Sequence, residues 1–377
     1  MSHPGFAPLL TPAEINAVCQ PLERASLLPG RVYADPAIYE FETKRLFMRS
    51  WLPLAREDEL PSPGTYFSRI IADEPVVITR DETGTIRAFS NVCRHRNRQV
   101  AEGAGSCKGG RITCPYHGWS YGIDGKLAGA PHMRGVEGFA KETIGLPELA
   151  VDLWQGFIFV NFDTEAEKLS TQLGKLDEVL NPLNLKDMVC QDFDRYTAPW
   201  NWKATLENFT EAYHQMTIHP GIDQLVPGVT TDYEDVDGPY NLFWIPTAPG
   251  VHFQSILPPM PGTTFSGIWV VNVFPFFHLL IDDGMVMWLD WEFNKVDEHD
   301  IIWRMMIPAA TAAEPDFAAK KVEIYKMIKE VWDEDIYACS GVRTGARSRF
   351  AVGGRMSLME RSVHQFQKWI AAEYQQG

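Results

Sequence analysis

Two hydrophobic patterns follow one another along the chain. From about Trp51 to Phe162, short apolar runs alternate with Gly, Pro and Asp-Gly turns, a pattern typical of brief β-strands. The clearest of these runs are residues 75–79, 86–89 and 157–162. The stretch therefore predicts a small all-β domain.

Beyond this stretch the apolar residues fall at helical spacing or form longer runs. Amphipathic helices are predicted over residues 200–218, 315–338 and 357–374, and long apolar strands between residues 243 and 307. The most apolar run, residues 268–281, contains Asn272, Pro275 and His278 and falls short of the ~20 apolar residues that span a bilayer. It predicts a buried strand pair, with no membrane segment, inside a larger α+β domain.

Helix start signals mark the N-terminal region. Residues 11–14, TPAE, have the form of a capping box with proline at the first helical position, and Asp35-Pro36 opens a second helix. We therefore expect three segments: residues 1–44 as helices that pack on the larger domain, residues 45–165 as the all-β domain, and residues 166–377 as the α+β domain.

Composition and charge narrow the class of protein. The chain has 45% hydrophobic residues, and its 34 Lys and Arg against 49 Asp and Glu leave a net charge of -15. Such a charge repels phosphate backbones and anionic membranes, so we expect no nucleic-acid and no membrane partner. The start MSHPGFAPLL lacks the basic residues and long apolar run of a signal peptide, which predicts a cytoplasmic protein.

A first group of candidate metal ligands lies in the β-rich stretch. Cys93-Arg94-His95 is followed after eighteen residues by Cys114-Pro115-Tyr116-His117. Two such mixed pairs on Gly- and Pro-rich loops can hold a [2Fe-2S] centre, with thiolates on one iron and imidazoles on the other. One alternative is a Cys2His2 zinc site, although zinc-finger motifs normally pair Cys with Cys and His with His. The other is a set of unrelated buried residues. Cys107 lies between the pairs and is expected to be a spectator.

A second group lies in residues 201–220, which read as a helix. Glu207, Asn208, Glu211 and His214 share one face at helical spacing. In a regular helix His219 would point elsewhere, but the proline that follows it disfavours helical backbone. The helix should therefore end near Ile218 and let His219 turn back toward His214.

Two imidazoles and one carboxylate form the facial triad of non-heme iron(II) oxygenases. Asp335 falls on the apolar stripe that contains Ile328 and Trp332, whereas Asp333 and Glu334 point away from it. A buried acid requires a cation or a hydrogen-bond donor. The alternative is an exposed acid at a frayed helix end.

The two motifs CRHRNRQV and CPYHGWSYGIDGKL together resemble the Rieske domain of the oxygenase component of Rieske non-heme iron oxygenases. The likeness covers roughly residues 45–165. It implies a Rieske domain with Cys93 and Cys114 on one iron and His95 and His117 on the other. It also implies that the second domain is a catalytic α+β domain, an antiparallel sheet covered by helices.

The resemblance extends to the second group. Glu334-Asp335-Ile336, followed by a Gly-containing turn, looks like the place where this family supplies its aspartate ligand, which implies mononuclear Fe(II) on His214, His219 and Asp335. In this family an acidic residue lies three positions before the first iron-binding histidine. It bridges that histidine and a cluster histidine of the neighbouring subunit.

That acid is Glu211 here, and the resemblance implies a head-to-tail homotrimer with Glu211 between His214 and His117 of the partner subunit. The alternative role of Glu211 is to orient His214 within one subunit. Asn208 would lie beside the iron as a hydrogen-bonding or distant sixth group, or else face solvent.

The resemblance implies a terminal oxygenase that takes electrons from NAD(P)H through a reductase, with or without a ferredoxin, and uses O2 to oxidise a small organic substrate. Glu at position 211 is typical of relatives resembling carnitine, choline and glycine betaine monooxygenases, which favours hydroxylation or oxidative N- or O-dealkylation. The alternative is the alpha subunit of a cis-dihydroxylating aromatic-ring dioxygenase.

Rival classes are a zinc-stabilised binding module and a stand-alone Rieske electron carrier. The strand aromatics are expected to fill the core rather than line a substrate pocket; they are Trp269, Phe274, Phe276, Phe277, Trp288 and Trp291.

Overall fold

The computed structural model describes residues 9–236, 238–251, 255–263 and 265–375. The chain forms two compact units, one of Phe47–Thr171 and one of Met1–Leu46 with Gln172–Gly377. Within the described residues, no helix combines the length and the apolar character needed to cross a bilayer. The smaller unit is built from strands and the larger one from an antiparallel sheet with helices, which confirms the predicted fold class.

Strands make up most of the regular secondary structure of the smaller unit. Its strands are β1 (Leu52–Arg56), β2 (Thr65–Ile71), β3 (Glu74–Arg80), β4 (Ile86–Ser90), β5 (Ala104–Ser106), β6 (Arg111–Thr113), β7 (Ser120–Gly122), β8 (Leu127–Gly129), β9 (Glu148–Trp154) and β10 (Phe157–Asn161), preceded by the short helix α3 (Phe47–Arg49). Seven strands form one sheet in the order β1-β10-β9-β4-β3-β2-β5, and β6-β7-β8 form a second. The predicted runs 75–79, 86–89 and 157–162 fall in β3, β4 and β10.

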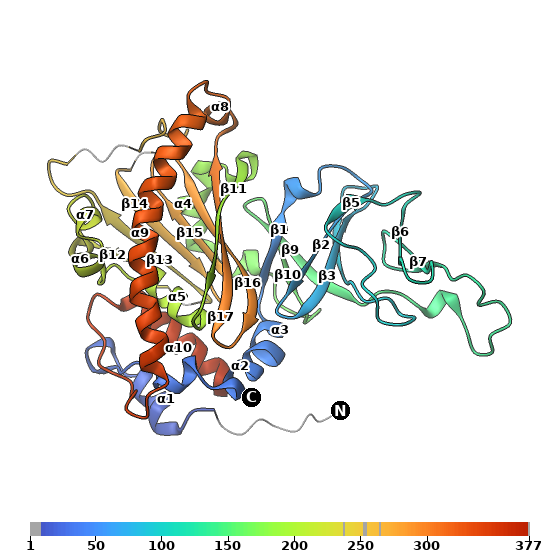
Figure 1. The fold of residues 1–377 in the computed structure, drawn as a ribbon, viewed down its shortest axis with the longest axis horizontal. Helices are drawn as coiled ribbons and strands as arrows, with labels where there is room; N and C mark the ends of the chain where they lie inside the picture. The colour runs from blue at the N-terminus through green and yellow to red at the C-terminus, as the bar shows by residue number, and fades with distance from the viewer. Residues whose placement is uncertain (1–8, 237, 252–254, 264, 376–377) are drawn as a thin grey trace. The chain divides into compact units, whose positions relative to one another are not determined.

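The larger unit places one antiparallel sheet behind a long helix (Figure 1). Its strands are β11 (Val189–Ala198), β12 (Asp232–Tyr233), β13 (Tyr240–Pro246), β14 (Gly267–Val273), β15 (Phe277–Ile281), β16 (Val286–Lys295) and β17 (Glu298–Ile307). They lie in the order β11-β17-β16-β15-β14-β13-β12. The predicted strand pair over residues 268–281 is confirmed as β14 and β15.

Ten α-helices are described in the chain, and nine of them belong to the larger unit. They are α1 (Pro12–Val18), α2 (Pro36–Phe41), α4 (Gly174–Leu180), α5 (Trp202–Phe209), α6 (Gln215–Ile218), α7 (Pro220–Asp223), α8 (Ala309–Ala312), α9 (Phe317–Ala346) and α10 (Arg361–Gln375). Both predicted helix starts are confirmed, because Thr11 caps α1 through a capping box and the Asp35 side chain caps α2.

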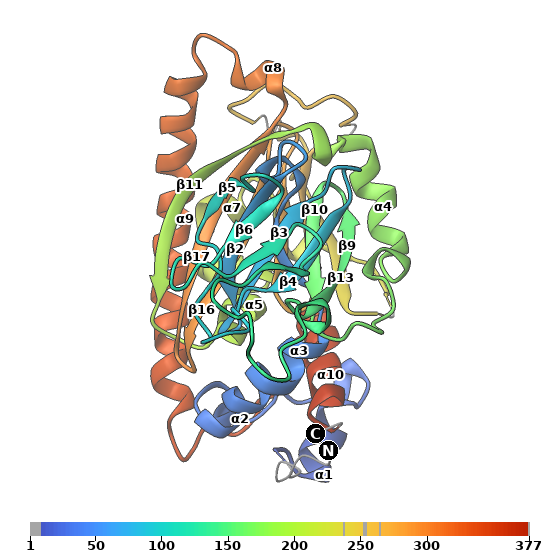
Figure 2. The same cartoon turned by 90° about the vertical axis from the view of Figure 1, so that its right-hand side faces the viewer.

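Helix α9 lies along the sheet in both views (Figures 1 and 2). Ile324, Trp332 and Cys339 of the helix share a buried cluster with Leu289 and Met305 of the sheet. The helix continues to Ala346, so the Gly-containing turn expected soon after residue 335 is wrong. Basic side chains hold the extra turns, since Arg343 and Arg347 both pair with Asp297, and cations are favourable near a helix C-terminus.

A buried ion pair anchors α5 from behind. The carboxylate of Glu42 accepts hydrogen bonds from Trp202 Nε1 at 2.9 Å and from Lys203 Nζ at 2.5 Å, and Tyr374 also donates to it. Removing one partner of such a pair would leave an uncompensated buried charge. The N-terminal segment and α10 therefore fix the position of α5, the helix that precedes the loop between α5 and α6.

Candidate active site

The two Cys/His loops of the smaller unit share one backbone design. Asn97 N donates to Cys93 O at 3.0 Å, and Gly118 N donates to Cys114 O at 3.1 Å. Both donors have left-handed backbone, with φ of 56° at Asn97 and 72° at Gly118. Asparagine and glycine are the residues that adopt this conformation most readily. Two matching turns thus present the Cys-x-His and Cys-x-x-His pairs despite their different spacing.

The turns bury the thiols and expose the imidazoles. Cys93 and Cys114 are each 2% exposed, whereas His95 and His117 are exposed and their ring centroids lie 4.6 Å apart. Burial, together with the neighbouring Cys93, raises the pKa of the Cys114 thiol. Two thiols and two imidazoles grouped in this way fit a [2Fe-2S] centre of the mixed-ligand type.

Tyr121 supports the thiol side of this group. Its hydroxyl accepts a hydrogen bond from Arg94 N at 2.9 Å and lies 3.3 Å from Cys93 Sγ. Because the backbone N–H already donates to the oxygen, the Tyr121 proton is free to be donated to sulfur. Trp119 stacks on His95 with centroids 4.9 Å apart. Tyr121 and Trp119 belong to the GWSY tail that follows His117.

The segment 201–220 is not the single helix that the sequence predicts. Helix α5 ends at Phe209 and α6 begins at Gln215. Between them the Glu211 carboxylate accepts hydrogen bonds from the backbone N–H of Tyr213 and, at 3.0 Å, of His214. A side chain that captures backbone donors competes with helix formation in this way.

The expected end of the helix at Ile218 is confirmed. His219 has φ of -118° and ψ of 57°, outside the helical region, and α7 begins at Pro220. The distortion turns His219 back, so that its ring centroid lies 5.1 Å from that of His214.

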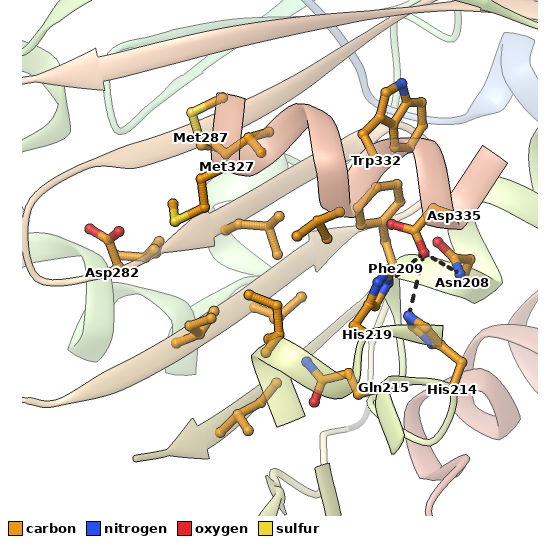
Figure 3. A pocket seen from close by; sticks show the side chains of 18 of the residues that line it. Asn208, Phe209, His214, Gln215, His219, Asp282, Met287, Met327, Trp332 and Asp335 are labelled. Atoms are coloured by element: carbon orange, nitrogen blue, oxygen red, sulfur yellow. Dashed lines mark hydrogen bonds and ion pairs between the residues drawn. The ribbon is translucent and has the colours of Figure 1, made fainter. Parts of the chain in front are cut away.

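The carboxylate of Asp335 faces both histidines (Figure 3). Its Oδ1 is 2.8 Å from His219 Nε2 and 3.5 Å from His214 Nε2. One ligand atom from each of the three side chains lies within 4.8 Å of the others. Asp335 is 4% exposed, which rules out an exposed acid at a frayed end. The donor set of two imidazoles and one carboxylate fits a non-heme iron(II) site.

A glutamate carboxylate lies within hydrogen-bonding distance of the Nδ1 atom of each histidine. Glu211 Oε1 lies 2.7 Å from His214 Nδ1, and Glu334 Oε2 lies 2.7 Å from His219 Nδ1. Carboxylates at Nδ1 fix the ring orientation and leave Nε2 for a metal ion. Sequence reasoning assigned Glu334 no part in the site, because it lies off the apolar stripe of its helix.

Asn208 contacts the same carboxylate. Its Nδ2 donates to Asp335 Oδ1 at 3.1 Å, and its Oδ1 is buried without a hydrogen-bond partner among the described residues. The opposite amide orientation would set two oxygens against each other, so the contact identifies which atom is nitrogen. Glu207, placed on the same face by the sequence pattern, instead accepts hydrogen bonds from Tyr33 and Gln367.

Burial and charge shift two ionisable groups of this region. Burial lowers the pKa of His219, but hydrogen bonds and charges from Asp335 and Glu334 outweigh it, and the pKa lies above its usual value. Burial raises the pKa of Glu207 to about 7, against the lowering effect of Gln367 and Tyr33. A metal ion would require His219 to be neutral at Nε2.

An apolar cavity of about 200 Å³ opens beside these residues. Phe243, Ile245, Ile268, Val270, Leu280 and Met287 of the sheet form one wall. Met327, Ile328, Val331 and Trp332 of α9 form another, and Asp335 continues the same helix face (Figure 3). The predicted apolar stripe therefore lines the cavity. None of the strand aromatics expected in the core lines it, and five of them are almost fully buried.

Two family patterns match the chain. Residues 50–140 match the Rieske [2Fe-2S] domain, and residues 186–376 match the ring hydroxylating alpha subunit (catalytic domain). The first match contains both Cys/His loops, and the second contains His214, His219 and Asp335.

Individual relatives agree with these matches. The carnitine monooxygenase oxygenase subunit of Escherichia coli (strain K12) is 30% identical over 343 residues, which cover 88% of this chain and 87% of that protein. The corresponding subunit of Acinetobacter pittii (strain PHEA-2) is 36% identical over 205 residues, which are 54% of this chain and 55% of that protein. This second match thus spans about half the length of the relative.

The fold has a close counterpart among solved structures. A crystal structure of the quaternary ammonium Rieske monooxygenase CntA in complex with an inhibitor superposes with a TM-score of 0.81 at 25% identity, covering 96% of this chain and 98% of the other. Sequence, domain order and fold agree, and the chain therefore belongs to the family of ring-hydroxylating alpha subunits that carry a Rieske [2Fe-2S] domain.

Proposed function

We propose that this chain is the terminal oxygenase component of a multicomponent Rieske oxygenase, and that it hydroxylates or oxidatively N- or O-dealkylates a small organic substrate. The observation that carries the proposal is the convergence of His214, His219 and Asp335 at the wall of an apolar cavity, in a chain that also has a Rieske domain.

The donor sets suit two different metal centres. Cys93 and Cys114 would hold one iron of a [2Fe-2S] cluster and His95 and His117 the other, while His214, His219 and Asp335 would hold mononuclear Fe(II). When bound, these centres supply single electrons and the activation of O2.

The protein's own groups prepare the mononuclear site. Glu211 and Glu334 hold the Nδ1 protons of the two histidines, which leaves each Nε2 lone pair facing the shared position. Asn208 donates to Asp335 and so limits the rotation of that carboxylate. The apolar walls of the cavity exclude water from the side on which the substrate carbon would lie.

Electrons would come from NAD(P)H through a partner reductase, with or without a ferredoxin. We propose a homotrimer in which Glu211 joins His214 to His117 of the partner subunit. Two observations support this role. Glu211 already contacts His214, and both cluster imidazoles are exposed at the surface of their unit.

Monooxygenation is favoured over cis-dihydroxylation, because a carnitine monooxygenase oxygenase subunit matches over 87% of its length, whereas biphenyl dioxygenase alpha subunits match over about half of theirs. Dihydroxylation of aromatic rings is the second candidate. The two outcomes differ in the number of oxygen atoms that pass from O2 to the product.

The test is metal analysis followed by a product screen with ¹⁸O2 and an electron donor on aromatic rings, methyl ethers and methylated amines. About three iron atoms per chain with inorganic sulfide support the oxygenase. Two would indicate an electron carrier, and zinc in place of iron would indicate a binding module. One labelled oxygen per product supports monooxygenation, and two support dihydroxylation.

A further inference from the structure

Among the described residues that line the cavity, one charged side chain is not used by the proposed metal site. Asp282 begins the turn between β15 and β16 and lines the cavity. Figure 3 shows it across the cavity from His214, His219 and Asp335. No lysine or arginine is among the described residues that line the cavity.

The backbone donors of the turn form hydrogen bonds with only one of the two carboxylate oxygens of Asp282. Asp282 Oδ1 accepts hydrogen bonds from Gly284 N at 2.7 Å and Met285 N at 2.8 Å. Among the described residues, Oδ2 has only a contact of 3.5 Å with Ser255 Oγ, at the limit of a hydrogen bond. An asparagine would accept the same two backbone hydrogen bonds, so the turn does not require a negative charge.

The position is unfavourable for an unpaired carboxylate. Burial, with a further contribution from the Asp283 charge, raises the pKa of Asp282 to about 6. The ion pairs found among the described residues do not include Asp282. A buried charge needs a partner, and a cationic group that enters the cavity would provide one.

We propose that Asp282 determines substrate specificity, and that the substrate is an apolar molecule with one ammonium group at the end farthest from the oxidised carbon. This inference rests on the proposed oxygenase function. The cavity of about 200 Å³ exceeds the ~150 Å³ that holds a benzene ring. Phe209 and Trp332 line it beside Asp335, which suits an apolar group at the metal end.

A negatively charged substrate group would find no cationic partner among the described residues at the Asp282 end of the cavity. A carboxylate on the substrate would enter a cavity whose described lining offers no basic side chain apart from the two histidines of the metal site. It would also meet Asp282. Zwitterions such as carnitine are therefore expected to bind poorly, which separates this chain from its carnitine-oxidising relatives.

The test measures ligand affinity for the holoenzyme by calorimetric titration, above a pH of about 7, where amine and Asp282 are both charged. The probes are 2-phenylethylamine, 2-phenylethanol and phenylacetate, which share a ring and differ in the end group. We expect the amine to bind about tenfold more tightly than the alcohol and phenylacetate to bind most weakly.

Asp282→Asn keeps the turn acceptor and removes the charge, so it should abolish the preference for the amine. The matched control is Asp283→Asn, which removes the neighbouring charge outside the cavity lining and should keep the preference. Equal affinity of the wild type for amine and alcohol, or an unchanged preference in Asp282→Asn, would overturn the inference.

Binding and turnover are scored separately on the same preparations. Products formed from O2 without any amine preference would refute the role of Asp282 and leave the oxygenase function standing. An amine preference that Asp282→Asn abolishes, in a protein that binds no mononuclear iron, would refute the oxygenase function and leave Asp282 as a recognition group.

Discussion

Glu334 Oε2 lies 2.7 Å from Nδ1 of His219, although Glu334 is the helix neighbour of the proposed ligand Asp335. Two consecutive acids on α9 thus contact both nitrogens of one imidazole. Because Asp335 Oδ1 is also 2.8 Å from His219 Nε2, the imidazole ring is held at both of its nitrogens.

This relationship predicts that Glu334→Gln weakens iron binding. The amide is a poorer acceptor than the carboxylate for the Nδ1 proton, and loss of such a partner reduces metal affinity by roughly 10- to 100-fold. Iron retention during dialysis against a graded chelator would measure the change. Asp333→Asn is the control, since Asp333 is exposed and pairs with Lys329. Wild-type retention in Glu334→Gln would show that the contact has no role in holding iron.

Asp335→Ala should remove mononuclear iron and leave the cluster spectrum intact. The proposed cluster ligands lie in the smaller unit, whereas Asp335 lies on α9 of the larger one. Iron content and the electron paramagnetic resonance signal of the reduced cluster give the two readings. A variant that keeps three iron atoms per chain would show that the carboxylate ligand is another residue.

Glu211→Gln should keep both metal centres and lose most of its coupled turnover. Glutamine retains one acceptor for the Tyr213 and His214 backbone donors, but its hydrogen bonds to imidazole are weaker by about 1–3 kcal/mol in total. Single-turnover kinetics of the prereduced protein would measure cluster oxidation in the presence of substrate and O2. Cluster oxidation at the wild-type rate would leave Glu211 only the role of orienting His214.

Tyr121→Phe should lower the reduction potential of the cluster. The hydroxyl donated to Cys93 Sγ stabilises the more negative, reduced state. If the hydrogen bond is stronger in the reduced state by about 0.5–1.5 kcal/mol, its loss lowers the potential of a one-electron couple by about 20–60 mV. Redox titration would measure the shift, and Tyr116→Phe is the control, because Tyr116 is exposed and its ring lies tilted against that of His117 instead. A shift of the same size in both variants would contradict the role of the Cys93 contact.

Glu207 should make the larger unit less stable as the pH rises. The unfolded carboxyl loses its proton near 4.5, but burial raises the folded pKa to about 7. Between these values the folded state holds the extra proton, so the free energy of unfolding falls with rising pH, by about 3 kcal/mol at most. Urea denaturation at several pH values would show the slope.

Glu207→Gln removes this titration and should flatten the pH dependence between 4.5 and 7. Exposed Glu330→Gln should leave the slope unchanged. An equally steep slope in Glu207→Gln would place the titrating group elsewhere in the unit.

The local features of the site were predictable from the sequence. Proline at 220 forces the break at His219, and the helical period places Asp335 with Ile328 and Trp332 on one face, as the cavity lining confirms. The Cys and His spacing similarly indicates paired ligand loops. Each of these inferences depends on residues within a few turns of one another, where backbone geometry alone sets the direction of a side chain.

Contacts between distant segments depended on the tertiary structure. The break after Phe209, where Glu211 captures two backbone donors, was missed because a side chain won the competition with the helix. The contact of Glu334 with His219 and the place of Asp282 in the cavity depend on how α9 and the β15–β16 turn pack around the histidines. Motif spacing and helical period were therefore enough to identify the groups that could bind metal and the helix face on which Asp335 lies. The packing of distant elements decided which acids contact the histidines and which line the cavity. Such long-range contacts follow from burial of the whole core and not from local periodicity.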